Sequence, residues 1–302
     1  MSTDLTREYK RNAEIFPDTL WPEGMHRVAL AVEYQGSHYH GFQSQATGVK
    51  TVQQMLERAL STVADEPITL VCAGRTDAGV HATAQVVHFD TLAERPDKAW
   101  VKGTRAQLPA DISVRWAMPV PPEFHARFSA RSRSYRYLLS DRSSYSALTH
   151  SQITWSRKKL DLAAMREAAR CLEGEQDFSS FRASQCQARS PVRRVDYIHL
   201  ARRGDLVVVE IKANAFLHHM VRNIVGVLLA IGAGERPVAW MAEVLAACDR
   251  RKGGVTAPPY GLYLVDVGYP SRFGLPVLSP GPLFVPESLG QIEVEASGSN
   301  GT

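Results

Sequence analysis

The stretch Ala73–His81, AGRTDAGVH, places one acidic and one basic side chain between two glycines. Glycine permits backbone conformations and close approaches that other residues resist. The apolar runs Ile68–Cys72 and Gln85–Phe89 flank the stretch and predict a strand on either side of it. We therefore interpret the stretch as a tight loop that presents Arg75 and Asp77. The alternative is a surface turn with a structural ion pair.

The residues around this loop alternate between strand and helix patterns. Apolar side chains occupy every second position of Val28–Tyr34, as in a half-buried strand. Thr51 and Gln54 form a capping box in front of apolar residues at helical spacing. The predicted elements of this half are strands at 28–34, 68–72, 85–89 and 112–118 and helices at 52–63 and 96–107. The order β-α-β-β-α-β is the ferredoxin-like pattern.

The second half of the chain repeats this order of elements without evident sequence identity to the first. Strands are predicted at 134–139, 195–200, 206–213 and 262–267, and helices at 162–172, with Gly174 as its stop, at 216–231 and from Pro237. We therefore expect an α+β fold of two ferredoxin-like halves, with adjoining, mainly antiparallel sheets and a central active-site cleft. The expected domains are residues 27–128, which hold the Asp77 loop, and residues 129–272. An N-terminal extension (1–26) and a flexible C-terminal tail (273–302) flank them.

Composition favours a cytoplasmic protein outside the membrane. The sequence has no run of about 18 or more apolar residues, so no membrane-spanning helix is predicted. The charged N-terminus does not resemble a secretory signal. The cysteines form no C-x-x-C pair, which favours free thiols over a zinc site or a disulfide framework. They are Cys72, Cys171, Cys186 and Cys248.

Charge is unevenly distributed along the chain. The net charge is +4, but residues 26–272 carry 32 basic and 23 acidic residues, whereas both ends are acidic. A basic body fits a polyanionic partner, although an ordinary surface can have similar totals. Two arginine-rich stretches lie within it. They hold Arg127, Arg131, Arg133 and Arg136, and then Arg182, Arg189, Arg193, Arg194, Arg202 and Arg203.

Arg222 lies in the predicted apolar helix Phe216–Ile231, within the segment HHMVRN. An arginine in such a helix is expected either to meet an anion, for which Asp77 is the candidate, or to reach the surface. The adjacent His218 and His219 are expected to point to different sides of that helix and so not to chelate together. Neither a metal site nor a nucleotide-cofactor motif is predicted.

Tyr135 lies in RSRSYRYLLS, where arginines alternate with aromatic residues. A stretch of this kind suits phosphate contact and base stacking in an RNA-binding protein. The alternative is a strand that packs Tyr135 and Tyr137 in the core.

Several of these stretches resemble the TruA family of tRNA pseudouridine synthases. AGRTDAGVH resembles the family's active-site loop, and FLHHMVRNIVG resembles the segment whose arginine pairs with the catalytic aspartate. FHARFSARSRSYRY is similar to the segment whose tyrosine stacks on the target uridine. EYQGSHYHGFQSQ, QLPADISV, FSSFRASQCQARSPVR and GLYLV extend the resemblance from about residue 28 to about residue 270. The chain departs from the family at Arg105-Ala106-Gln107, where an asparagine-containing segment is common.

The resemblance implies both an activity and a set of site residues. Asp77 corresponds to the nucleophile, Arg75 and Arg222 are its arginine partners, Tyr135 stacks on the uridine, and Leu262 lines the site. Arg127, Arg131, Arg193 and Arg194 are the expected tRNA-binding residues. The family isomerises uridine to pseudouridine at positions 38–40 of the tRNA anticodon stem-loop. It acts as a homodimer, with the tRNA touching both subunits, and needs neither a metal nor a small-molecule cofactor.

Two other functions stay open from the residues alone. The first is a non-catalytic RNA-binding protein with the same basic surface. The second is a metal-dependent hydrolase that uses Asp77, His81 and His88.

Overall fold

The first half of the chain folds around strand β1, His26–Tyr34, most of whose residues are buried. The computed structural model describes residues 22–45 and 48–285. In it, β1 pairs antiparallel with β3 (His81–Thr91) on one edge and with β4 (Ile112–Val120) on the other. Strand β2, Val71–Cys72, pairs antiparallel with β3. The resulting order β4-β1-β3-β2 is the ferredoxin-like order that the sequence predicts.

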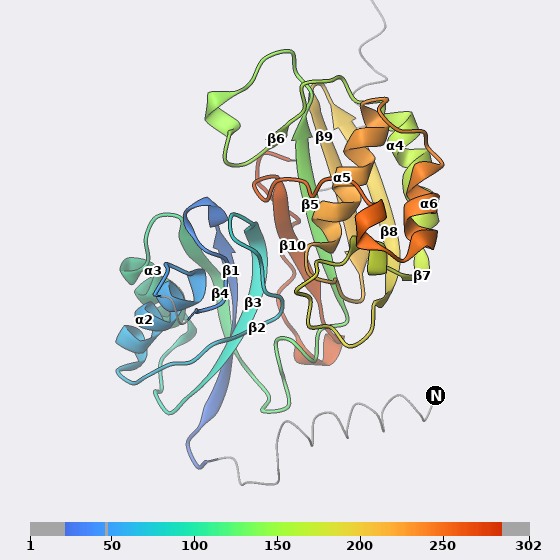
Figure 1. Cartoon of the computed structure of the whole chain (residues 1–302). Helices are drawn as coiled ribbons and strands as arrows, with labels where there is room; N and C mark the ends of the chain where they lie inside the picture. Colours follow the sequence, from blue (N-terminus) through green and yellow to red (C-terminus); the bar gives the residue numbers. More distant parts are fainter. Residues whose placement is uncertain (1–21, 46–47, 286–302) are drawn as a thin grey trace, which may run out of the picture.

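Two helical segments accompany these strands (Figure 1). Helix α2, Val52–Ala64, begins at Thr51, and the predicted capping box is confirmed: Thr51 Oγ1 accepts from Gln54 N and Gln54 Oε1 accepts from Thr51 N. A π-helical turn, Ala99–Gly103, runs directly into the short helix α3, Thr104–Gln107. Both segments bury apolar side chains, so they cover the sheet rather than extend from it.

The second half repeats the spatial order of the first. Its elements are β5 (Ser132–Ser140), β6 (Thr154–Trp155), α4 (Leu162–Ala169), β7 (Gly174–Asp177), β8 (Val192–Arg203), β9 (Leu206–Ala213), α5 (Met220–Gly232), α6 (Trp240–Ala247) and β10 (Leu262–Gly268). The antiparallel order β10-β5-β9-β8 corresponds to β4-β1-β3-β2, with β7 added at the edge. Helices α4, α5 and α6 lie together on one side of these strands (Figure 1).

Strand β10 joins the two halves. It pairs antiparallel with β5 and, through Tyr263–His81 and Leu264–Ala82, parallel with β3. The two predicted sheets are therefore one continuous sheet of ten strands. Strand β10 pairs with the beginning of β3, and β2 pairs with β3 further along, at Val87 and His88. The loop that connects β2 to β3 therefore lies between the segments of β3 that pair with these two strands.

Some boundaries differ from the prediction. Strand β3 begins at His81 rather than at residue 85, because the polar residues His81, Thr83 and Gln85 are buried in the sheet. Helix α5 begins at Met220 rather than at residue 216, because His219 adopts a left-handed backbone conformation with φ 63°. Gly174 opens β7 after a 3-10 turn has ended the preceding helix.

The residues that follow β10 pack back onto the sheet. Phe273 and Val285 are both buried, and Arg136 Nη1 donates to the carbonyl oxygens of Pro280 and Gly281 at 3.2 and 3.1 Å. The prediction of a flexible tail from residue 273 did not anticipate these contacts. Residues 1–21 and 286–302, which make up most of the predicted terminal extensions, lie outside the described residues.

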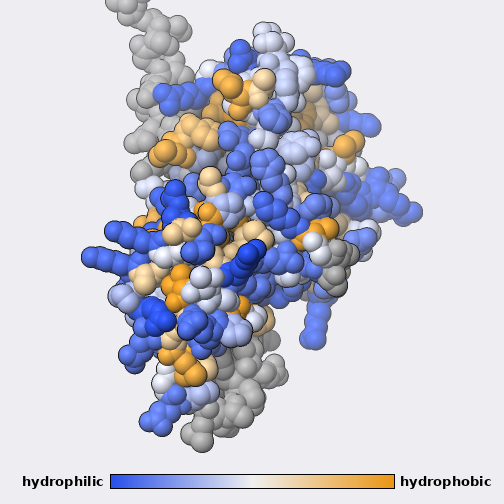
Figure 2. All heavy atoms as spheres, turned by 90° about the vertical axis from the view of Figure 1, so that its left-hand side faces the viewer, coloured by the Kyte–Doolittle hydropathy of each residue, from blue (hydrophilic) through white to orange (hydrophobic). Residues whose placement is uncertain are grey.

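The face of the molecule in Figure 2 is dominated by hydrophilic residues, with small separate groups of apolar ones. Among residues 22–45 and 48–285, no helix has the length and apolar character needed to span a bilayer. All four cysteines are free, as the sequence predicts.

Candidate active site

The loop that carries Asp77 is held by the loop that follows β1. Phe42 N donates to the carbonyl oxygen of Thr76 at 3.1 Å, and Gly79 N donates to that of Tyr39 at 3.3 Å. The two backbones lie so close that a Cβ atom on Gly36 would stand 1.9 Å from the carbonyl oxygen of Val80. The segment EYQGSHYHGFQSQ is thus the support of the Asp77 loop.

Side chains from the sheet also fix the loop. Gln85 binds both backbone groups of Gly74, accepting from its N–H at 3.3 Å and donating to its carbonyl oxygen at 2.5 Å. The hydroxyls of Tyr34 and Thr76 lie 2.8 Å apart in the interior. Because the loop backbone is fixed at both ends, the Asp77 side chain is presented from a rigid frame.

Three basic side chains converge on the Asp77 carboxylate, whose side chain is 23% exposed. Arg222 Nη1 lies 3.3 Å from Oδ2, His219 Nε2 lies 3.3 Å from Oδ2, and His218 Nε2 lies 3.2 Å from Oδ1. All three come from the second half of the chain, and Asp77 comes from the first. The arrangement therefore forms only when the two halves are packed together.

The structure overturns the expectation that His218 and His219 diverge. Neither residue is inside helix α5, which begins at Met220, and the left-handed conformation of His219 turns both rings to the same side. The ring centroids lie 4.0 Å apart. Burial lowers the pKa of His219 in spite of the nearby Asp77 carboxylate, so its neutral form is favoured. The adjacent histidines were visible in the sequence, but the backbone turn that pairs them was not.

The two candidate arginine partners of Asp77 differ in position. Arg222 is anchored by its Nε, which donates to the carbonyl oxygen of Ala257 at 2.8 Å, while Ala257 N donates to the Arg222 carbonyl at 3.1 Å. Arg75 is exposed, and in the described part of the chain no ion pair joins it to Asp77. The geometry thus brings Arg222, and not Arg75, to the carboxylate.

Tyr135 and Leu262 lie on neighbouring strands, β5 and β10. Tyr135 is 9% exposed and meets the ring of Phe216 edge-on, with ring centroids 5.0 Å apart. Burial raises the pKa of its hydroxyl, so the phenol is protonated at neutral pH. Leu262 is buried opposite Tyr137, whose hydroxyl donates to the carbonyl oxygen of Pro258 at 2.7 Å. Tyr135 and Tyr137 are thus both packed in the core, as the core alternative expects.

The first arginine-rich stretch serves several purposes. Arg127 and Arg131 are exposed. Arg133 Nη2 donates to the carbonyl oxygens of Ala73 and Arg127 at 2.9 and 2.8 Å, so it ties β5 to the start of the Asp77 loop. Arg136 is 1% exposed and pairs with Glu210, with Nε 2.6 Å from Oε2. Arg136 therefore does not face RNA, because its buried side chain pairs with Glu210 of the neighbouring strand β9 and donates to the carbonyl oxygens of Pro280 and Gly281.

The second arginine-rich stretch lies on β8 and the segment before it. Arg193 is partly buried and donates to the carbonyl oxygens of Ser190 and Val192 at 2.9 and 2.6 Å. Arg194 is exposed, with its Nε 3.1 Å from Asp196 Oδ1. Arg202 pairs with the buried carboxylate of Asp141 at 2.8 Å.

The histidines of the hydrolase alternative are structural. His81 Nδ1 accepts from Gly36 N at 3.0 Å, and His88 Nδ1 accepts from Ala126 N at 3.1 Å. Burial lowers the pKa of His81 to about 4 and that of His88 to about 2. Within the described residues, neither histidine shares a ligand group with Asp77, so this alternative loses its support.

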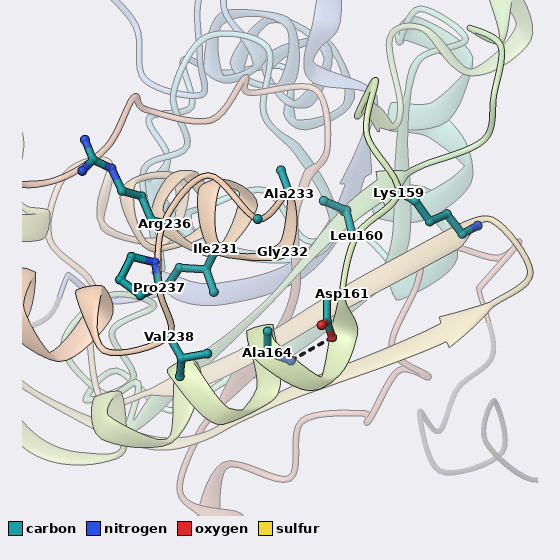
Figure 3. A pocket seen from close by; sticks show the side chains of 11 residues that line it. Lys159, Leu160, Asp161, Ala164, Ile231, Gly232, Ala233, Arg236, Pro237 and Val238 are labelled. Carbon is teal, nitrogen blue, oxygen red and sulfur yellow. Dashed lines mark hydrogen bonds between the residues drawn. The ribbon is translucent and has the colours of Figure 1, made fainter.

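A cavity of about 540 Å³ lies away from Asp77, between the start of α4, the end of α5 and residues 233–238 (Figure 3). Asp161 accepts from Ala164 N at its rim, as the cap of α4. Its lining includes none of the predicted site residues.

Known proteins of one family are similar to this chain. A family described as tRNA pseudouridine synthase matches residues 30–129 and 168–270. The chain is 59% identical to the tRNA pseudouridine synthase A of Pseudomonas aeruginosa over 262 residues, which cover 87% of this chain and 92% of the relative. The proteins of the same name from Klebsiella pneumoniae and Alcanivorax borkumensis are 56% and 52% identical; they match 86% and 88% of this chain and 96% and 99% of their own lengths.

The Asp77 loop, Arg222 and Leu262 lie inside the matched ranges. Tyr135 lies between the two ranges and is not matched. The family match spans more than half of the chain, and the identities hold over nearly the whole of the relatives. This chain belongs to the family of tRNA pseudouridine synthases.

Proposed function

We propose that this enzyme isomerises uridine to pseudouridine at positions 38–40 of the tRNA anticodon stem-loop, with Asp77 as its nucleophile. The observation that carries the proposal is the Asp77 carboxylate, which a rigid loop of one half presents to Arg222 of the other. The family match supports the reaction, and the resemblance of AGRTDAGVH to the active-site loop of the TruA family supports the choice of residue and of tRNA positions.

The reaction rearranges atoms that the substrate already contains. The bond between N1 of uracil and C1′ of ribose breaks, the base turns, and C5 bonds to C1′ in its place. C5 loses its proton and N1 gains one, so the product has the composition of the substrate. No oxidant, reductant or co-substrate is needed for this balance, and we propose that no cofactor takes part.

The protein's contribution is to extract and hold one nucleotide. A base stacked inside a helix cannot reach a carboxylate that is held in a loop between the two halves, so the uridine must leave its stack. From the family resemblance we assign Tyr135 to stacking on the extruded base and Leu262 to lining the site. The exposed Arg127 and Arg131 suit phosphate contacts. Asp77 then makes and breaks a bond to the uridine, oriented by Arg222.

Release of tritium from tRNA labelled at C5 of uridine tests the proposal directly. The proposed reaction releases one tritium for each pseudouridine formed, and a chelator should leave the rate unchanged. A protein that binds the tRNA without releasing tritium would instead be the non-catalytic RNA-binding alternative.

The double variant Arg193→Ala/Arg194→Ala should bind tRNA more weakly than the wild type. Fewer phosphate counterions are released on binding, so the slope of log affinity against log salt should become shallower by about one to two. Filter binding at several salt concentrations measures both effects. Lys158→Ala, which removes an exposed lysine paired with Glu235, is the matched control and should leave the slope unchanged. Unchanged affinity and slope in the double variant would assign both arginines to an ordinary surface.

We further propose that the enzyme acts in the cytoplasm as a homodimer and that one tRNA touches both subunits. The family resemblance supports this, and isologous pairing is the commonest symmetric assembly. Light scattering at micromolar concentration should give twice the chain mass of 33.4 kDa. A stable species of the single-chain mass under those conditions would contradict it.

A further inference from the structure

Asp77, His218 and His219 together form a set of metal donors. One carboxylate oxygen of Asp77 and one ring nitrogen of each histidine all lie within 4.8 Å of one another. The closest pairs are 3.2 Å for His218 Nε2 to Oδ1 and 3.3 Å for His219 Nε2 to Oδ2. The histidine side chains are 38% and 30% exposed, so an ion can reach them from solvent.

The 3.2 Å between His218 Nε2 and Oδ1 suits two ligands of a tetrahedral ion, and the third ligand atom, from His219, lies within 4.8 Å of the other two. Zinc binds histidine nitrogen and carboxylate oxygen at about 2.0–2.2 Å, so two ligands of a tetrahedral site stand roughly 3.3–3.5 Å apart. Two imidazoles with one carboxylate are a donor set that zinc and neighbouring divalent transition metals accept, whereas magnesium and calcium prefer oxygen donors.

We propose that Asp77, His218 and His219 bind a divalent transition-metal ion of the zinc class, and that the bound ion inhibits the enzyme. The binding follows from the geometry alone, and the inhibition rests on the proposed role of Asp77 as the nucleophile. An ion on the carboxylate withdraws the electron pair that Asp77 needs and occupies the place of the target uridine.

The neighbouring arginine limits how tightly the ion binds. Arg222 approaches Oδ2 and is fixed by its hydrogen bond to Ala257, so its positive charge stays beside the carboxylate. Oδ1, which faces His218, lies on the side without this arginine contact. We therefore expect the ion to bind through Oδ1 and reversibly.

The test combines a binding measurement with an activity measurement on the full-length enzyme. Zinc binding is measured by titration calorimetry, and cobalt binding by visible absorption, which reports a tetrahedral site with nitrogen and oxygen ligands. Activity is measured as tritium release with zinc, magnesium or chelator added, each relative to the same variant without metal. The variants are His218→Gln and His219→Gln. The control is His199→Gln, which changes a histidine on β8 that stacks on Tyr197.

The proposal expects one zinc ion per chain, inhibition that a chelator reverses, and no inhibition by magnesium. Each site variant should lose at least about tenfold in zinc affinity, since even residues that only support a metal ligand contribute this much. His199→Gln should bind zinc as the wild type does. Zinc binding that is undetectable in the wild type, or equally strong in both site variants, overturns the site. Zinc that binds at the site without slowing tritium release overturns the inhibition and the nucleophile assignment of Asp77, but not the site.

Discussion

Replacing Asp77 by asparagine is expected to give a folded protein that binds tRNA within a few-fold of the wild type and forms no detectable pseudouridine. The amide keeps the shape of the side chain, and the loop is held by backbone contacts that the substitution does not touch. What disappears is the negative charge on which Arg222, His218 and His219 converge. An amide is too weak a nucleophile to replace the carboxylate.

Tritium release and filter binding on the same preparation check this expectation. Asp205→Asn is the matched control: it removes an exposed carboxylate, 56% accessible and paired with Lys159, and should keep full activity. Turnover by Asp77→Asn above about 1% of the wild type corresponds to a loss of less than roughly 2.7 kcal/mol. That result would exclude an essential role for the carboxylate in making or breaking the bond.

Replacing Arg136 by methionine is expected to reduce the free energy of unfolding by about 3–5 kcal/mol, because it leaves a buried charge without its partner. The Arg136 side chain is 1% exposed and that of Glu210 is 13% exposed. The same change removes the two hydrogen bonds to the carbonyl oxygens of Pro280 and Gly281, which hold this segment against the sheet. Urea denaturation followed by circular dichroism measures the loss.

The double variant Arg136→Met/Glu210→Met separates the two contributions. Removing both charges takes away the unpaired carboxylate, so this variant should recover part of the lost stability. The hydroxyl of Tyr197, which donates to Glu210 Oε1 at 2.7 Å, loses its acceptor in the double variant, so recovery should be incomplete. If Arg136→Met alone loses less than about 1 kcal/mol, the pair is not the buried ion pair that its burial indicates.

Hydrophobic periodicity was sufficient to predict the α+β class and the order of the main elements, but not the short strands β6 and β7. Three signals come from residues that are close together in the sequence. They are the alternation of apolar residues in β1, the capping box at Thr51 and the apolar residues at helical spacing in α2. The same local patterns predicted two halves with equal order, which the strand pairing confirms. The start of β3 was missed because the residues before Gln85 are the polar His81 and Thr83 and the small Ala82 and Ala84, which give only a weak apolar signal although all four are buried.

The candidate site shows the limit of local patterns more clearly. Motif resemblance selected Asp77 and Arg222, which meet in the structure. It could not show that His218 and His219 join them, because this depends on a single left-handed residue in front of α5. Nor could it separate Arg133, which ties β5 to the Asp77 loop, from Arg136, which pairs inside the sheet. Arginines of the same strand thus have different roles, because the strands that pair with β5 decide which arginine side chain is buried.

The position of β10 also has a consequence for how the chain is made. A ribosome completes β3, which ends at Thr91, about 180 residues before it completes β10, its parallel neighbour, which ends at Gly268. Domains of growing chains generally fold as units from the N-terminus. During that interval the first half has the free edge of β3 beside the Asp77 loop, with its backbone groups at His81 and Ala82 unpaired. Unpaired edges invite pairing with other chains. Nascent chains that stop before Leu262 should therefore aggregate more readily than the finished protein, and activity should appear only after the last strand has left the exit tunnel.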